Sequence, residues 1–222
     1  MKRSTWTIIL VVLGILPISG VHGTATAQDA VLLVQMHADG KIWRYTGTPC
    51  SSVNACPGWQ VLDNNPASKS IAAVGANLYQ MHADGKIWHY TGTPCSGGSC
   101  PGWQLLDNNP DTKSIALGGQ LYQLHNSGKI WRYTGTPCTG NSCPGWQLLD
   151  NNARRTAIFA SIGLYQLHNT GAVWHYTGVP CSGNSCPGWQ LLDNNPNTKA
   201  IALGELLKLT LPPQNVSLSK LF

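Results

Sequence analysis

The sequence predicts an all-β protein, a β-propeller of four-stranded antiparallel blades. Two tryptophan series recur at a nearly constant step, and each period holds four short strand-like segments between turn residues. Apolar residues at helical spacing are not seen. The first series is Trp43, Trp88, Trp131 and Trp174, at steps of 45, 43 and 43 residues. The second series is Trp59, Trp103, Trp146 and Trp189, at steps of 44, 43 and 43 residues.

The third repeat shows the expected strands in order. Residues 114–117 form the first strand, with Asn-Pro before them and Gly-Gly after them, and residues 121–125 form the second. The turn at Asn126-Ser127-Gly128 leads into the third strand, residues 129–133, with chemistry typical of a β-hairpin. Residues 145–150 form the fourth strand. Four strands in about 43 residues are typical of a propeller blade.

The repeats define the domain organisation. A repeat domain is expected over residues 28–205, and its four copies are residues 31–66, 67–110, 111–153 and 154–197. The first copy lacks a convincing first strand, whereas residues 198–204 repeat that strand after the fourth copy. We expect this segment to pair beside the first copy and close a ring of four blades. The tail, residues 206–222, leaves the pattern; if it is a truncated fifth blade, the chain is an open arc that must oligomerise.

Three segments of the repeat resemble a known family. They are Gly-Trp-Gln-Leu-Leu, Ala-Ile-Ala-Leu-Gly and Leu-Tyr-Gln-Leu-His-x-x-Gly-x-Ile-Trp, and they are similar to tectonin/tachylectin-type β-propeller repeats over residues 31–204. The resemblance implies glycan binding in a recognition or innate-defence role, with one shallow site per blade. The chain departs from the family in blade number, usually five or six, and in carrying a cysteine pair in each repeat.

The N-terminal segment has the features of a cleaved signal peptide, residues 1–27. Lys2 and Arg3 precede an apolar run over residues 8–18, and the small residues 25–27 give an Ala-x-Ala cleavage site. The apolar run is shorter than the ~20 residues of a membrane span, and no second run follows. We therefore expect a secreted, extracellular protein without a membrane span in the mature chain. A retained N-terminal anchor is the alternative.

Eight cysteines fall as one local pair per repeat. In an exported protein this even pattern indicates four short disulfides. Zinc is the alternative, but blades hold equivalent loops apart, so no metal site and no cofactor are expected. The expected pairs are Cys50–Cys56, Cys95–Cys100, Cys138–Cys143 and Cys181–Cys186.

Charge and composition exclude two function classes. Without residues 1–27 the chain has 12 basic and 9 acidic residues, which are too few and too scattered for nucleic-acid binding. Sugar hydrolysis needs two carboxylates at a set separation, yet Glu205 is the only glutamate and lies outside the repeats. We expect no catalytic residues and no enzyme activity.

Three repeated side chains are candidates for carbohydrate binding. Histidine at the end of the second strand and asparagine in the Asp-Asn-Asn turn are expected on one face, and the tryptophan that opens the fourth strand on the other. Histidine and asparagine can hydrogen-bond sugar hydroxyls, and an indole can stack on a sugar ring. Turn formation and core packing are the competing roles. The candidates are His37, His82, His125, His168, Asn65, Asn109, Asn152, Asn195, Trp59, Trp103, Trp146 and Trp189.

Together these observations predict a secreted, multivalent lectin whose partners are glycans or glycoconjugates. Equivalent weak sites on several blades would raise avidity without any new contact. The alternative is a protein-binding propeller scaffold without catalytic activity. Near-identical repeats argue mildly against it, because a single asymmetric partner would favour divergent faces. A homo-oligomer is compatible with either function.

Overall fold

The computed structural model describes residues 32–153 and 155–204. Within these ranges the chain forms antiparallel β-sheets and no helix. The described residues therefore contain no helix that could cross a membrane. The predicted signal peptide and the tail at residues 206–222 lie outside the described residues. The predicted all-β class is confirmed.

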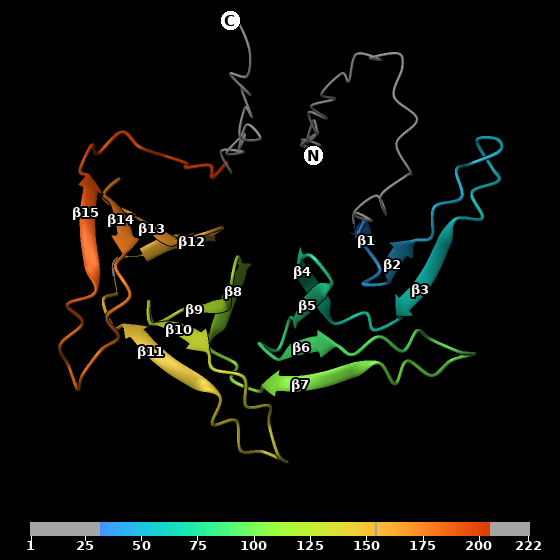
Figure 1. The fold of residues 1–222 in the computed structure, drawn as a ribbon, viewed down its shortest axis with the longest axis horizontal. Helices are drawn as coiled ribbons and strands as arrows, with labels where there is room; N and C mark the ends of the chain where they lie inside the picture. The colour runs from blue at the N-terminus through green and yellow to red at the C-terminus, as the bar shows by residue number, and fades with distance from the viewer. Residues whose placement is uncertain (1–31, 154, 205–222) are drawn as a thin grey trace, which may run out of the picture. The chain divides into compact units, whose positions relative to one another are not determined.

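Four sheets follow one another along the chain, one for each repeat (Figure 1). The first has three strands: β1 (Val34–Met36), β2 (Ile42–Tyr45) and β3 (Trp59–Asp63). The second has β4 (Ser68–Val74), β5 (Asn77–His82), β6 (Ile87–Tyr90) and β7 (Trp103–Asp107). The third has β8 (Thr112–Leu117), β9 (Leu121–His125), β10 (Ile130–Tyr133) and β11 (Trp146–Asp150). The fourth has β12 (Arg155–Ala160), β13 (Leu164–His168), β14 (Val173–Tyr176) and β15 (Trp189–Asp193).

The hairpin between β9 and β10 shows how the repeat fixes its register. Leu124 pairs with Ile130 and Gln123 with Trp131, across the predicted turn. Gly128 has φ +87°, a left-handed conformation that favours glycine. A Cβ at Gly128 would also lie 2.6 Å from the Cα of Ala153, in the turn that follows β11. Glycine at this position is therefore required both by the backbone conformation of the turn and by the close approach of the turn that follows β11.

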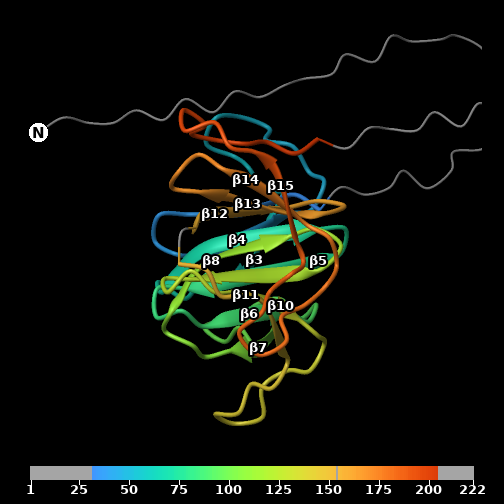
Figure 2. The same cartoon turned by 90° about the vertical axis from the view of Figure 1, so that its left-hand side faces the viewer.

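The hydrophobic core lies between successive sheets, and Figure 2 shows the molecule from the side, with β4 and β5 running across the view. The cluster between the second and third sheets contains Met81, Ile87 and Leu106 from one side and Leu121 from the other. Trp146 packs against the same cluster from β11. Equivalent clusters join the first sheet to the second and the third to the fourth. Each blade is therefore stabilised mainly by its neighbours.

The expected closing strand is not formed. Residues 198–204 belong to no strand, and the first sheet has three strands only. Among the described strands, contacts join β1 to β4, β4 to β8 and β8 to β12, but they do not join the fourth sheet to the first in the same way. A lone strand needs a neighbouring edge for its backbone groups. Because the fourth sheet does not lie against the first, residues 198–204 do not reach the edge of β1.

The four predicted disulfides are confirmed, at S–S distances of 1.99–2.04 Å. Each closes a loop of five or six residues, which contributes about 2 kcal/mol in the chain-entropy model. The stapled loop also lies along the preceding blade: the Cys138 N–H donates to Leu105 O at 3.1 Å, and Asn108 Nδ2 to Asn141 O at 3.3 Å. Four disulfides are typical of proteins from an oxidising environment.

Candidate functional site

A cavity of about 250 Å³ lies between the second and third blades. The second blade supplies a carboxylate at the end of β7 and an asparagine from the following turn, and the third blade supplies the rest. The cavity combines acidic, amide, imidazole and indole groups with one disulfide sulfur. Its lining residues are Asp107, Asn109, Gln123, His125, Trp131, Cys143, Pro144 and Trp146.

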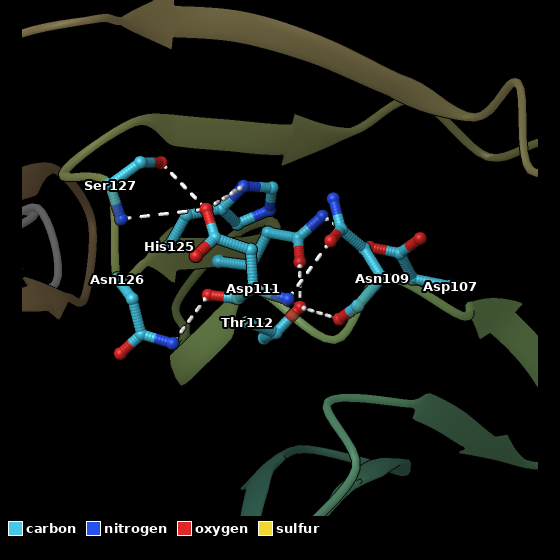
Figure 3. Close-up of polar contacts among 8 residues, drawn as sticks. Asp107, Asn109, Asp111, Thr112, His125, Asn126 and Ser127 are labelled. Carbon is cyan, nitrogen blue, oxygen red and sulfur yellow. Dashed lines mark hydrogen bonds and ion pairs between the residues drawn. The ribbon is translucent and has the colours of Figure 1, made fainter.

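A buried chain of hydrogen bonds forms one wall and joins the two blades (Figure 3). Gln123 Nε2 donates to Asp107 Oδ2 at 2.7 Å, and the Thr112 hydroxyl donates to Gln123 Oε1 at 2.9 Å. Gln80 makes the same bond to Asp63 across the first interface, at 2.6 Å. The carboxylate that ends the fourth strand is thus buried against the next blade, where it couples the two sheets.

His125 is held by a carboxylate that only this repeat carries. Its side chain is 4% exposed, and Nδ1 lies 3.5 Å from Asp111 Oδ2. Ser127 Oγ donates to the same Asp111 oxygen at 2.7 Å, and Asn109 Oδ1 accepts the Asp111 N–H at 3.0 Å (Figure 3). Burial lowers the pKa of His125, while Asp111 and Asp107 oppose this shift. The neutral ring with its proton on Nδ1 fits this arrangement, which leaves Nε2 as an acceptor.

Two ring nitrogens at this cavity are buried without a hydrogen-bond partner in the described structure. They are His125 Nε2 and Trp131 Nε1, and the centroids of their two rings lie 5.9 Å apart. The second blade repeats the arrangement with His82 and Trp88, whose centroids lie 5.7 Å apart. An indole N–H is a donor, so each pair presents one donor and one acceptor. A hydroxyl group, which both donates and accepts, matches such a pair.

The cavity brings together one candidate of each predicted kind: Asn109, His125 and Trp146. Strand order had suggested that tryptophan and histidine lie on opposite faces. The structure instead places the indole of Trp146 across the interface, where Nε1 donates to Leu106 O at 2.9 Å. Trp103 and Trp189 make the equivalent bonds, to Leu62 O and Leu149 O. These tryptophans join the blades, and only part of the Trp146 ring is left to line the cavity.

The other candidates have more varied surroundings. Asn65 and Asn195 use Oδ1 as Asn109 does, to accept a backbone N–H two residues later, at 2.9 and 3.0 Å. This is the turn-forming role that was weighed against sugar binding. Asn152 follows β11 in the corresponding turn, and its N–H donates to Asp150 Oδ1 at 3.2 Å.

The histidines of the end blades differ in exposure, whereas Trp59 and Trp189 are both half-buried. His37 stacks on Trp43 at 5.7 Å but is exposed, because the first sheet lacks the strand that pairs with the histidine in the other sheets. Its neighbour Trp59 contacts Tyr45 at 5.3 Å. His168 is buried and stacks on Trp174 at 5.8 Å.

Trp131 and Gln123 also line the cavity, and they are not among the candidates that the sequence indicates. The signal was present in the spacing. Histidine and tryptophan lie six positions apart across a glycine hairpin, which places their rings side by side on adjacent strands.

Two further cavities lie between blades: one of about 370 Å³ between the first and second blades beside Arg44, and one of about 440 Å³ between the second and third blades beside Arg132. Both guanidinium groups donate to a glutamine of the neighbouring strand, Gln60 and Gln147. Their charge is therefore partly engaged within the blade. In the described residues no group of three histidine, cysteine, aspartate or glutamate side chains is arranged to hold a metal ion.

The buried histidines give the fold a predictable pH dependence. Burial lowers the pKa values of His82, His89 and His125 below the ordinary 6.5. The unfolded chain then binds protons first as the pH falls, so stability is complete above 6.5 and declines below it. We expect the midpoint of urea unfolding, followed by tryptophan fluorescence, to decrease as the pH is lowered from about 8 to about 5.

A matched pair of variants checks this expectation. The double variant His82→Gln/His125→Gln should show a smaller decline, whereas replacement of the exposed His37 by glutamine should leave it unchanged. Equal declines in all three proteins would contradict the assignment.

Comparisons with known proteins find similarity to solved structures only, and at low sequence identity. No protein family and no curated protein matches the chain. Among solved structures, the chain is similar to human WBSCR16, with a TM-score of 0.44 and 12% identity over 68% of this chain. The chain spans about half of that protein, 49% of its length. A second structure, reported under "The de novo evolutionary emergence of a symmetrical protein is shaped by folding constraints", has a TM-score of 0.44 and 13% identity, with 72% of this chain and 73% of that chain covered.

Proposed function

We propose that this protein is an exported, multivalent carbohydrate-binding protein with equivalent shallow sites between its blades. The observation that carries the proposal is the buried donor and acceptor at one cavity, Trp131 Nε1 and His125 Nε2, neither of which has a protein partner in the described structure. Unpartnered buried polar atoms cost free energy, so a hydroxyl group that reached these two atoms would be stabilised by them. The similarity of the repeats to tectonin/tachylectin-type lectins supports the same function.

The remaining lining fits a small polyhydroxylated ligand. Trp146 contributes an aromatic surface for the C–H groups of a sugar ring, and Asn109 contributes amide atoms at the rim. The volume of about 250 Å³ is below the roughly 300–1,000 Å³ of pockets for drug-sized ligands. We therefore expect a single terminal sugar to enter, with the rest of the glycan outside.

Repetition of the site supplies the avidity that a shallow pocket lacks. The paired histidine and tryptophan rings recur in every blade, at centroid distances of 5.7–5.9 Å. Sites on one rigid protein raise the effective concentration of a branched glycan for the second binding event. Weak binding of a single sugar is thus compatible with strong binding to a glycan-coated surface.

Nuclear magnetic resonance of the indole N–H groups tests the proposal directly. A neutral-sugar panel is titrated into the exported protein, and a ligand should shift the signals of Trp88 and Trp131, whose Nε1 atoms lack partners. The signals of Trp103 and Trp146 should move little, because their Nε1 atoms already donate to backbone carbonyls.

Two variants form a matched pair, one for the test and one for the control. Trp131→Phe should abolish one binding event and leave the fold intact, whereas Trp146→Phe removes a bond between blades but keeps the donor of Trp131. If no sugar on a broad panel produces a saturable shift, and a glycan array is also negative, the proposed function is wrong.

A further inference from the structure

Two outer faces of the repeat array are left bare by the described residues. Leu192 on β15 is 53% exposed, whereas its counterparts Leu62, Leu106 and Leu149 are at most 1% exposed. Leu33, just before β1, is 49% exposed, whereas the leucines at that position in the other repeats are at most 3% exposed. The difference lies in the neighbours, because the sequences of the repeats are nearly identical. Each bare face lacks the blade that covers its counterpart.

The two bare faces are complementary halves of one interface. In the cluster between the second and third blades, the leading blade supplies Met81, Ile87 and Leu106, and the following blade supplies Leu121, Tyr133 and Trp146. On its bare side the fourth blade carries residues at the positions of the leading set, Leu167, Val173 and Leu192; Leu192 is half exposed there, whereas Leu167 is buried. The first blade presents the following set, Leu33, Tyr45 and Trp59.

The polar groups of the interface are complementary as well. At each internal interface a tryptophan Nε1 of the following blade donates to a leucine carbonyl of the leading blade, at 2.8–2.9 Å. A cysteine N–H of the stapled loop donates to another carbonyl on the same strand. The first blade carries these donors as Trp59 and Cys50, and the fourth carries the acceptors as the carbonyls of Leu191 and Leu192.

The described fold does not join these halves within one chain. Leu33 and Leu192 are both half exposed in the same molecule, and the strands of the fourth sheet do not pack on those of the first as successive sheets do. We propose that the fourth blade of one copy packs on the first blade of a second copy, head to tail, with the geometry of the internal blade interface. Such a contact is heterologous, since two different surfaces meet.

The contact would also complete a further inter-blade pocket. Asp193 and Asn195 of one copy occupy the positions of Asp107 and Asn109, and His37 and Trp43 of the other copy occupy those of His125 and Trp131. Ligand binding at that pocket rests on the proposed function, but the assembly itself does not. The two ideas therefore fail independently.

Light scattering on the exported chain tests the assembly without any ligand. We expect a mass of at least two copies, which falls to one copy in Leu33→Asp and in Leu192→Asp, because each buries a charge in one half of the contact. Ile162→Asp is the matched control: Ile162 is exposed but belongs to neither half, and the mass of this variant should stay unchanged. Tryptophan fluorescence and circular dichroism confirm that the variants are folded.

A mixing experiment distinguishes this contact from any symmetric one. The Leu33→Asp chain keeps an intact fourth-blade face, and the Leu192→Asp chain keeps an intact first-blade face. Equal amounts of the two single-copy variants should therefore form a two-copy species with one of each. A one-copy mass for the unaltered chain, which would indicate closure within the chain or cover by residues 205–222, overturns the proposal. So does a mixture that stays at one copy, or variants that keep the unaltered mass.

Discussion

Gly145→Ala is expected to lower the free energy of unfolding by about 3 kcal/mol, although it adds a single methyl group. A Cβ at this position would lie 1.9 Å from Thr136 O and 2.9 Å from a ring carbon of Tyr133. Backbone must shift to make room, and the next residue, Trp146, would then lose its bond to Leu106 O. The glycines at the same position in the other repeats show the same 1.9 Å approach. They are Gly58, Gly102 and Gly188.

Gly119→Ala is the matched control. It adds the same methyl group in the same blade, but no atom lies within 4 Å of the added Cβ and the φ angle is not left-handed. Urea unfolding followed by tryptophan fluorescence should show an unchanged or slightly raised midpoint for Gly119→Ala and a large decrease for Gly145→Ala. Equal midpoints would mean that the loop before β11 adjusts freely, and that the glycine is not required by packing.

The strands were predictable because their determinants are local. The hairpin at residues 126–128 follows from glycine and asparagine chemistry, and the four-strand period follows from turn spacing. The disulfides were predictable for the same reason, since each pair is five or six residues apart. Neighbouring residues fix these features without reference to any other blade.

The surroundings of the candidate site were not predictable, because they depend on the preceding blade. Alternation along β11 shows that Trp146 and Leu148 share a face, but it does not show which blade covers that face. The position of the stapled loop along β7 likewise depends on contacts between repeats, such as Cys138 N to Leu105 O. The failure of residues 198–204 to close the ring has the same origin, because closure depends on how far apart the end blades lie.

One signal for the interface was nevertheless visible in the sequence. In every repeat a glutamine precedes the histidine by two positions, inside an otherwise apolar strand. In every repeat an aspartate ends the fourth strand. From the sequence alone, these aspartates belong to an Asp-Asn-Asn turn. In the structure, Asp107 is buried and accepts a hydrogen bond from Gln123 of the next blade. A polar residue that recurs at a buried strand position indicates a partner, because an unpaired amide there is costly.

Gln123→Met is therefore expected to lower the free energy of unfolding by about 3 kcal/mol, more than the loss of an average hydrogen bond. Methionine fills nearly the same volume, so no cavity forms, but Asp107 loses the donor that lies 2.7 Å from Oδ2 and stays buried with its charge. Thr112 Oγ1 loses one of its two acceptors in the same change and keeps Asn109 O, at 3.0 Å. Unfolding in urea gives the difference, and Gln104→Met, at an exposed position of β7, should leave the midpoint unchanged.

The double variant Asp107→Asn/Gln123→Met separates the charge from the packing. If the penalty comes from a buried carboxylate that keeps the Asn108 N–H on Oδ1 but has lost the donor to Oδ2, removing the charge should recover part of the stability lost in Gln123→Met, although the double variant has fewer native groups. Recovery of this kind appears as a coupling free energy between the two positions. Additive losses would instead show that Gln123 acts through its shape alone. The link between blades would then depend on the apolar cluster and on the tryptophan N–H, with no contribution from the buried amide and carboxylate.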